Sequence, residues 1–219
     1  MPVSKRLYPL IACAGIVTAV VAAVLGRLDP APYLDVFNLT ISEYAVLDRG
    51  GADELALAAL GGASFVTVVG LRAAGAPMGT AAERLLLAWS AALVVLAAVP
   101  GVAPGLGAEL TVQAHRYASA VAFVALPVAG GLMAGRFRED GRWRAVAGPV
   151  EWLALAGGFG LLAITYVALP GHGVLIGLVE RVLLGIGTAL IAVLAVRLAR
   201  LTWARSVPHA SRASRAALS

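Results

Sequence analysis

The side chains that could do chemistry in this sequence gather in three short segments, each beside a long apolar run. Carboxylates and an imidazole can donate or accept protons, and a guanidinium can hold an anionic group. Such groups are rare within apolar helices, where they face a bundle interior or a wet cavity, so they mark candidate sites. The candidate proton-transfer residues are Asp35, Glu43, His115 and Glu180.

One polar face is predicted in the fourth apolar run, where Thr111, His115 and Ser119 recur every four residues. That spacing places the three side chains on one side of a helix, which should point into a bundle rather than toward lipid. A structural interpretation stays open, in which His115 bonds a backbone carbonyl and Arg116 reaches outward to lipid phosphates.

Glu180 and Arg181 lie about two turns into the last apolar run, roughly 10 Å from its start at 1.5 Å per residue. Adjacent residues on a helix point about 100° apart, so this pair should find partners on other elements. The charges either form a network that only sets helix register, or belong to a ligand-binding or catalytic site. The expected partners are His115 or Arg116 for Glu180, and Asp35 or Glu43 for Arg181.

The elements that must position these residues are long enough to cross a bilayer. Of the 219 residues, 60% are hydrophobic and 13% are charged, and the mean hydropathy is +0.89. So few polar residues could not cover a water-facing surface, which excludes a soluble globular fold. We predict an all-α integral membrane protein, a bundle of six transmembrane helices with a short amphipathic helix in the first extracytoplasmic loop. The predicted spans are 7–26, 54–72, 84–100, 110–135, 149–169 and 174–198.

Basic residues predict the direction of the spans. Of the 17 Lys and Arg residues, 13 fall in the N-terminus, the break at 72–84, the loop at 136–148 and the tail. Both termini should therefore be cytoplasmic. Residues 1–200 are predicted to form one membrane domain, and 201–219 a basic, disordered cytoplasmic tail. The net charge of +5 fits this topology better than nucleic-acid binding, because no basic patch carries interleaved aromatic residues.

Local chemistry gives further expectations about the ends and contacts of the spans. Asp53 is predicted to cap the second span, and Pro149 and Glu151 to occupy the first turn of the fifth. Aromatic residues near span ends should lie at membrane interfaces, and small residues four apart should let helices approach closely. The aromatic residues are Trp89, Trp143, Trp152, Trp203 and Tyr166, and the small pairs are Gly131/Gly135, Ala154/Gly158 and Gly173/Gly177.

In the first loop, Tyr33, Phe37, Ile41 and Tyr44 recur at helical spacing, which predicts the amphipathic helix. The motif Thr40-x-x-Glu43 matches a capping box, so Glu43 either bonds its own helix start or faces a pocket.

Three of these elements together resemble a known family. They are Asn38-Leu-Thr-Ile-Ser-Glu-Tyr-Ala45 after the first span, His115 early in the fourth, and Gly177-Leu-Val-Glu-Arg181 in the sixth. Their order and spacing are similar to those of the bacterial six-span membrane family catalogued as domain of unknown function nine hundred and ninety-eight. This chain lacks the aromatic-Pro-x-Asp element that the family often has before the fourth span. The resemblance implies a six-span fold, a shared set of pocket residues and a bacterial-type cytoplasmic membrane, and it implies no activity.

Two functions fit these residues. The first is an extracytoplasmic-side pocket, lined by the first, fourth and sixth spans, that binds or transforms an amphiphilic lipid or isoprenoid. Its sharpest version is a terpenoid cyclase, in which a protonated Glu180 or Glu43 starts the reaction and aromatic faces stabilise the carbocation. Whether the chain is such a cyclase or isomerase, a lipid-modifying enzyme, or no enzyme stays open. The second function is a transporter or structural partner whose buried charges fix helix packing.

The site prediction is as follows. The candidate catalytic residues are Glu180, Glu43, Asp35 and His115. The candidate substrate-binding residues are Arg181, Arg116, Phe37, Tyr44, Tyr117, Ser42, Asn38 and His172. No metal site or cofactor is expected, because Cys13 is the single cysteine and no HExxH motif is present. The expected partners are membrane lipids and a hydrophobic small molecule, without nucleic acid, and homo-oligomers are compatible with the sequence.

Overall fold

The computed structural model describes residues 4–26, 37–38, 51–99, 108–170 and 173–204. Within these ranges the chain forms six long α-helices and no strand. All six helices are long and apolar enough to cross a membrane. The helices are α1 (Ser4–Leu25), α3 (Ala52–Ala74), α4 (Thr80–Ala98), α5 (Ala108–Glu139), α6 (Arg144–Ala168) and α7 (Ile176–Ala204).

The prediction of an all-α, six-span protein is confirmed, with shifts at helix ends. The fifth span begins at Arg144, so Pro149 lies inside α6 and not in its first turn. The last helix continues to Ala204, past the predicted domain boundary at 200. Most of the loop predicted to hold the amphipathic helix, and residues 205–219 of the tail, lie outside the described residues.

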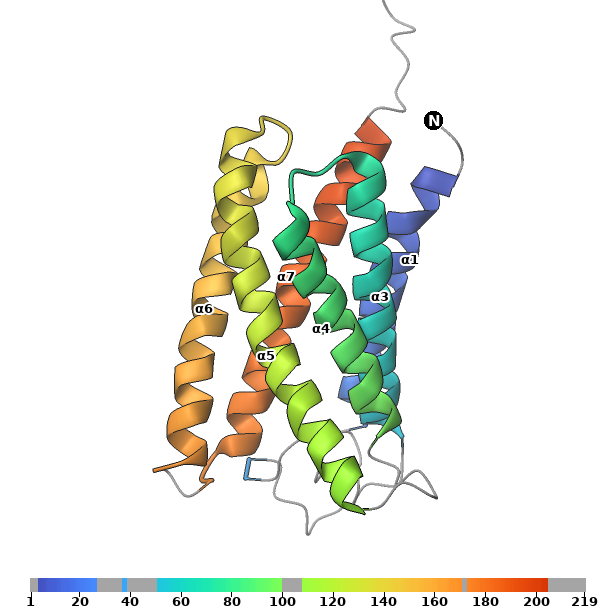
Figure 1. The fold of residues 1–219 in the computed structure, drawn as a ribbon. Coiled ribbons are helices and arrows are strands. Elements are labelled where there is room, and N and C mark those ends of the chain that lie inside the picture. Colours follow the sequence, from blue (N-terminus) through green and yellow to red (C-terminus); the bar gives the residue numbers. More distant parts are fainter. Residues whose placement is uncertain (1–3, 27–36, 39–50, 100–107, 171–172, 205–219) are drawn as a thin grey trace, which may run out of the picture.

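The helices form a ring in chain order, closed by α7 (Figure 1). Each helix packs against the next one in sequence, and α7 also contacts α1, α3 and α5. Because the helices alternate in direction, the start of α1, the α3–α4 and α5–α6 turns and the end of α7 share one end of the bundle, here called the terminal end. The starts of α3, α5 and α7 lie at the other, here called the opposite end.

The core of the ring is filled by Leu, Ala and two tryptophans. Trp89 of α4 is 2% exposed, and its Nε1–H donates to Ser64 Oγ of α3 at 3.1 Å. Trp143 is fully buried and stacks on Phe137, with 5.2 Å between ring centroids. Trp89 lies halfway along α4, so the prediction that it lies at a membrane interface was wrong, whereas Trp143 lies in the turn before α6, at a span end as expected.

Close helix contacts use Gly157, Gly130 and the predicted Ala154, but not the predicted Gly131, Gly135 or Gly158. A Cβ on Gly157 of α6 would come within 2.7 Å of the Pro127 ring of α5. By contrast, a Cβ on Gly131, Gly135 or Gly158 would meet nothing within 4 Å. The spacing of small residues thus indicated the right kind of packing, but not the helix face that uses it.

At the terminal end, one ion pair joins the two helices of each hairpin, α3–α4 and α5–α6. Arg72 Nε lies 3.1 Å from Glu83 Oε1 across the α3–α4 turn. Arg138 of α5 pairs with Glu151 of α6. Because α6 begins seven residues before Glu151, this carboxylate binds a guanidinium rather than the helix N-terminus that the sequence suggested.

Candidate functional site

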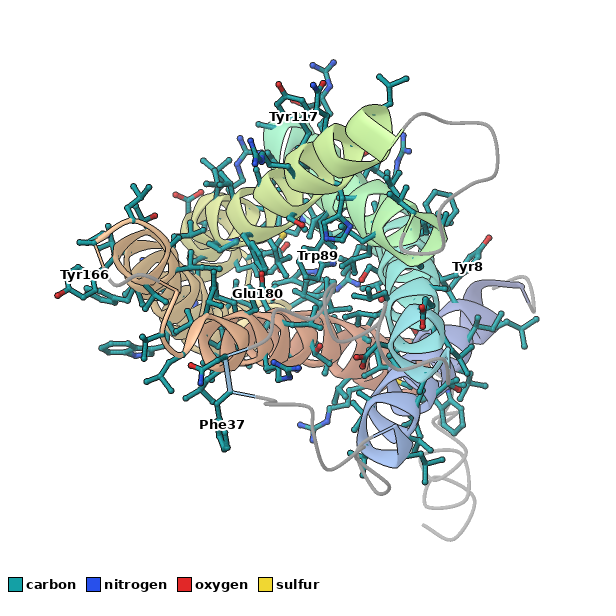
Figure 2. All side chains as sticks on the ribbon, turned by 90° about the horizontal axis from the view of Figure 1, so that it is seen from below. Tyr8, Phe37, Trp89, Tyr117, Tyr166 and Glu180 are labelled. Carbon is teal, nitrogen blue, oxygen red and sulfur yellow. The ribbon has the colours of Figure 1, made fainter. Side chains whose placement is uncertain are left out.

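The first turns of α7 direct Glu180 and Arg181 toward different parts of the bundle. Glu180 shares a helix face with the buried Leu183, one turn later, and the buried Gly187, two turns later. Its side chain points into the ring (Figure 2). Arg181 shares a helix face with Gly185 and borders a cleft on another side of α7. This arrangement agrees with the expectation that Glu180 and Arg181 point toward different elements.

A cleft of about 440 Å³ lies between α1, α3 and α7. Its volume falls within the roughly 300–1,000 Å³ of ligand pockets. Each helix contributes one face to the wall, and most wall residues are aliphatic or small. They are Ile16, Ala19, Val20, Ala23 and Val24 of α1; Asp53, Ala56, Leu57 and Leu60 of α3; and Arg181, Leu184, Gly185, Thr188, Ala189 and Ala192 of α7. The described walls of this cleft come from the first, second and sixth spans, whereas the predicted pocket used the first, fourth and sixth.

The charged residues of the cleft wall are Arg181 and Asp53. Asp53 lies in the first turn of α3 and Arg181 in the second turn of α7, so both charges sit at the opposite end of the bundle. Arg181 and Ala192 are eleven residues apart, so the wall extends about 16 Å from the charged end toward the middle of the bundle. Along this length Thr188 satisfies its own hydroxyl by donating to Leu184 O at 2.8 Å.

Asp53 is the site residue that the sequence did not reveal. It was expected to cap α3, but Gly51 holds the N-cap position, with a φ of 65° and no side-chain cap. Asp53 instead lies in the first turn, where the helix dipole favours an anion, and its side chain reaches the cleft. The sequence did contain a signal for the α7 wall of the cleft. Gly185, Ala189 and Ala192 form a face of small residues that continues from Arg181.

The first loop meets the start of α7 through Phe37 and Asn38. The N–H of Leu175 donates to Asn38 Oδ1 at 2.8 Å, and the N–H of Leu178 donates to Phe37 O at 3.1 Å. Leu175 has a φ of 65°, a strained conformation for a branched residue, just where Asn38 accepts its N–H. Asn38 thus organises the entry into α7.

Two of the three predicted aromatic residues, Phe37 and Tyr117, do not line the cleft. Phe37 is 58% exposed and Tyr117 is 69% exposed. Both side chains point away from the bundle in Figure 2. Among the described residues, none in the cleft wall is aromatic.

The polar face of α5 is only partly turned inward. His115 and Ser119 are half-buried, and His115 is in register with the buried Ala118 and Ala122. Arg116 is exposed, as in the structural interpretation that sends it outward. None of these residues belongs to the cleft wall. The remaining site candidates, Asp35, Ser42, Glu43, Tyr44 and His172, lie outside the described residues, as does the side chain of Thr111.

In the described part of the chain, no group of three or more His, Cys, Asp or Glu residues is placed to hold a metal ion. The cleft offers an apolar body with a cation and an anion at one end.

Comparison with known proteins places the whole bundle in one family. The family described as "Protein of unknown function (DUF998)" matches residues 13–197, which run from the middle of α1 to near the end of α7. No curated protein and no solved structure matches the chain.

Proposed function

The chain therefore belongs to the DUF998 family, whose description states no activity, and we propose that this multi-pass membrane protein binds an amphiphilic molecule in the cleft between α1, α3 and α7. The observation that carries the proposal is the uneven wall of the cleft. Aliphatic and small residues cover its length, and Arg181 and Asp53 stand at one end.

An apolar tail would lie along α1 and α7, because Ile16, Val20 and Ala189 offer it only hydrocarbon. Burial between helices is not itself favourable for a lipid tail, since the surrounding bilayer is equally apolar. Selection must therefore come from the polar end. There Arg181 keeps its charge at any physiological pH and can form two parallel hydrogen bonds to a carboxylate or phosphate.

Asp53 limits the kinds of headgroup that suit the charged end of the cleft. A carboxylate beside the guanidinium accepts hydrogen bonds from a hydroxyl or an amine, so a headgroup with both an anionic and a donor group suits the pair. A lipid or an isoprenoid with such a headgroup is the class that we propose. The same cleft gives less support to a cyclase, because its described residues place Asp53 at the charged end but include no aromatic face for a carbocation.

We also propose the orientation and location that the basic residues predict, with both termini cytoplasmic in a bacterial-type cytoplasmic membrane. The cleft would then have its charged end near the outer surface. Membrane lipids would be the source of the ligand or its competitors.

Photo-crosslinking tests the proposal. Two diazirine probes, a C16 fatty acid and the matching C16 alcohol, are added to the protein in nanodiscs, and labelled peptides are mapped by mass spectrometry. We expect labelling to concentrate on α1 and α7 next to the cleft. Gly185→Leu should abolish it, because Gly185 lines the cleft and has open space around its Cβ position.

Gly62→Leu is the matched control, since Gly62 is an exposed helix residue that also has open space at its Cβ position and does not line the cleft. Arg181→Gln should weaken labelling by the acid about tenfold and leave the alcohol unchanged, from the worth of a hydrogen bond to a charged group. Arg116→Gln removes an exposed charge of α5 that lies outside the cleft wall and should change neither. Labelling that is unchanged in Gly185→Leu, or that is spread evenly over α6, would contradict binding in the cleft. Arg181 and Asp53 would then have a role only in helix register.

A further inference from the structure

The terminal end of the bundle holds a second cluster of charges, on the side away from the cleft's charged end. Three arginines from different elements meet the short α3–α4 loop or the α5–α6 turn. Arg136 of α5 packs its guanidinium against Gly79, so closely that no side chain could be added there. Arg142 of the turn reaches Ala74 O with Nη2 at 3.5 Å. Arg197 of α7 donates to the carbonyl of Arg142, with Nε at 2.9 Å.

The backbone of Arg142 is held in place, but its guanidinium makes few hydrogen bonds to the described residues. The backbone N–H of Arg142 donates to Asp140 Oδ1 at 2.7 Å. The fully buried Trp143 anchors the next position of the turn. Its guanidinium is half-buried, its Nε atom is buried without a hydrogen-bond partner among the described residues, and its contact with Ala74 is at the outer limit of a hydrogen bond. A buried guanidinium N–H without an acceptor is costly, so this geometry is suited to an acceptor from outside the chain.

The carboxylates at this end do not fill that role. Two are bound to other arginines, one accepts the backbone N–H of Arg142, and one is exposed on α5. Residues 1–6 and 205–219, the chain ends that continue from this face, contain no Asp or Glu. The four carboxylates are Glu83, Glu151, Asp140 and Glu139.

We propose that Arg142, flanked by Arg136 and Arg197, forms a binding site for a phosphate group at the terminal end of the bundle. Phosphate offers several oxygens to guanidinium groups that approach from different directions, which matches three arginines from α5, the turn and α7. The site lies where the helices end, at the level at which a bilayer presents phosphate headgroups. An anionic phospholipid and a soluble phosphoryl compound share this chemistry.

Unfolding of the full-length protein in nanodiscs tests the site. Nanodiscs of phosphatidylcholine alone are compared with nanodiscs that contain phosphatidylglycerol, and the melting temperature is measured by far-UV circular dichroism. We expect phosphatidylglycerol to raise the melting temperature of the wild-type chain. Arg142→Gln should remove most of this rise and, by native mass spectrometry, weaken retention of phosphatidylglycerol at least about tenfold.

Arg84→Gln is the matched control, because Arg84 is exposed in the first turn of α4 at the same end and makes no ion pair with a described residue. It should keep the full rise. Arg142→Lys keeps the charge and protects the test if the Gln variant does not fold; it should lose part of the rise, because lysine lacks the planar fork.

Equal losses in Arg142→Gln and Arg84→Gln would show diffuse attraction to basic residues and would overturn the site. A rise that survives in both variants would overturn it as well. In detergent, stabilisation by inorganic phosphate over chloride at equal ionic strength, lost in Arg142→Gln and without a phosphatidylglycerol effect, would support the phosphate site and assign it to a soluble compound.

Discussion

The hydrogen bond between Trp89 of α4 and Ser64 of α3 should stabilise the bundle measurably, and the chain offers a matched pair of serines to test it. Ser64 Oγ accepts from Trp89 Nε1 at 3.1 Å and donates to Leu60 O at 2.7 Å. Ser90 is also buried and donates to Leu86 O at 2.9 Å, but it receives no bond from another helix. Ser64→Ala and Ser90→Ala therefore remove the same local bond, and only the first leaves the indole N–H without its acceptor.

The expected difference follows from that orphaned donor. A buried donor without an acceptor costs about 1–3 kcal/mol in general. Interhelical hydrogen bonds in membrane proteins average about 0.6 kcal/mol and reach about 1.7 kcal/mol, because the unfolded chain in lipid also finds partners. We expect Ser64→Ala to reduce the free energy of unfolding by about 1 kcal/mol more than Ser90→Ala, which is about fivefold in the unfolding equilibrium.

Reversible unfolding in mixed micelles, followed by far-UV circular dichroism, measures this difference. Trp89→Phe supplies the double-mutant cycle, because phenylalanine keeps an aromatic ring and has no N–H. In that background Ser64→Ala and Ser90→Ala should cost the same. Equal costs in the wild-type background, or a difference that persists in Trp89→Phe, would refute the assignment of the stabilisation to this bond.

Two further predictions concern helix packing and topology. Gly157→Ala should destabilise the protein by about 1–3 kcal/mol through overpacking against the ring of Pro127, whereas Gly158→Ala should be neutral or slightly stabilising, as equilibrium unfolding of the two variants would reveal. Cysteines placed one at a time in loop 27–50 of a cysteine-free chain should react with a membrane-impermeant maleimide added outside intact cells, while one at Gly141 should not; the reverse pattern would invert the proposed orientation.

Span number and length followed from the sequence because a bilayer leaves a chain few choices. Backbone groups in hydrocarbon must bond within a helix, so six apolar runs of sufficient length become six helices. The same argument located Glu180 and Arg181 near the start of the last helix and gave them different directions. Helix ends were less determined, since Gly51 and not Asp53 is the N-cap of α3, and Arg144 and not Pro149 begins α6.

Which faces meet was decided only by the tertiary structure. In lipid, a side chain facing the bilayer and one facing the core are equally apolar, so hydropathy does not mark the inner face. Trp89 and Trp152 illustrate this, because the first is 2% exposed in the core and the second is 74% exposed on the outside. The rotation of each helix follows from close contacts between particular side chains, and it is this rotation that brings Asp53 and Arg181, which are 128 positions apart, to one cleft.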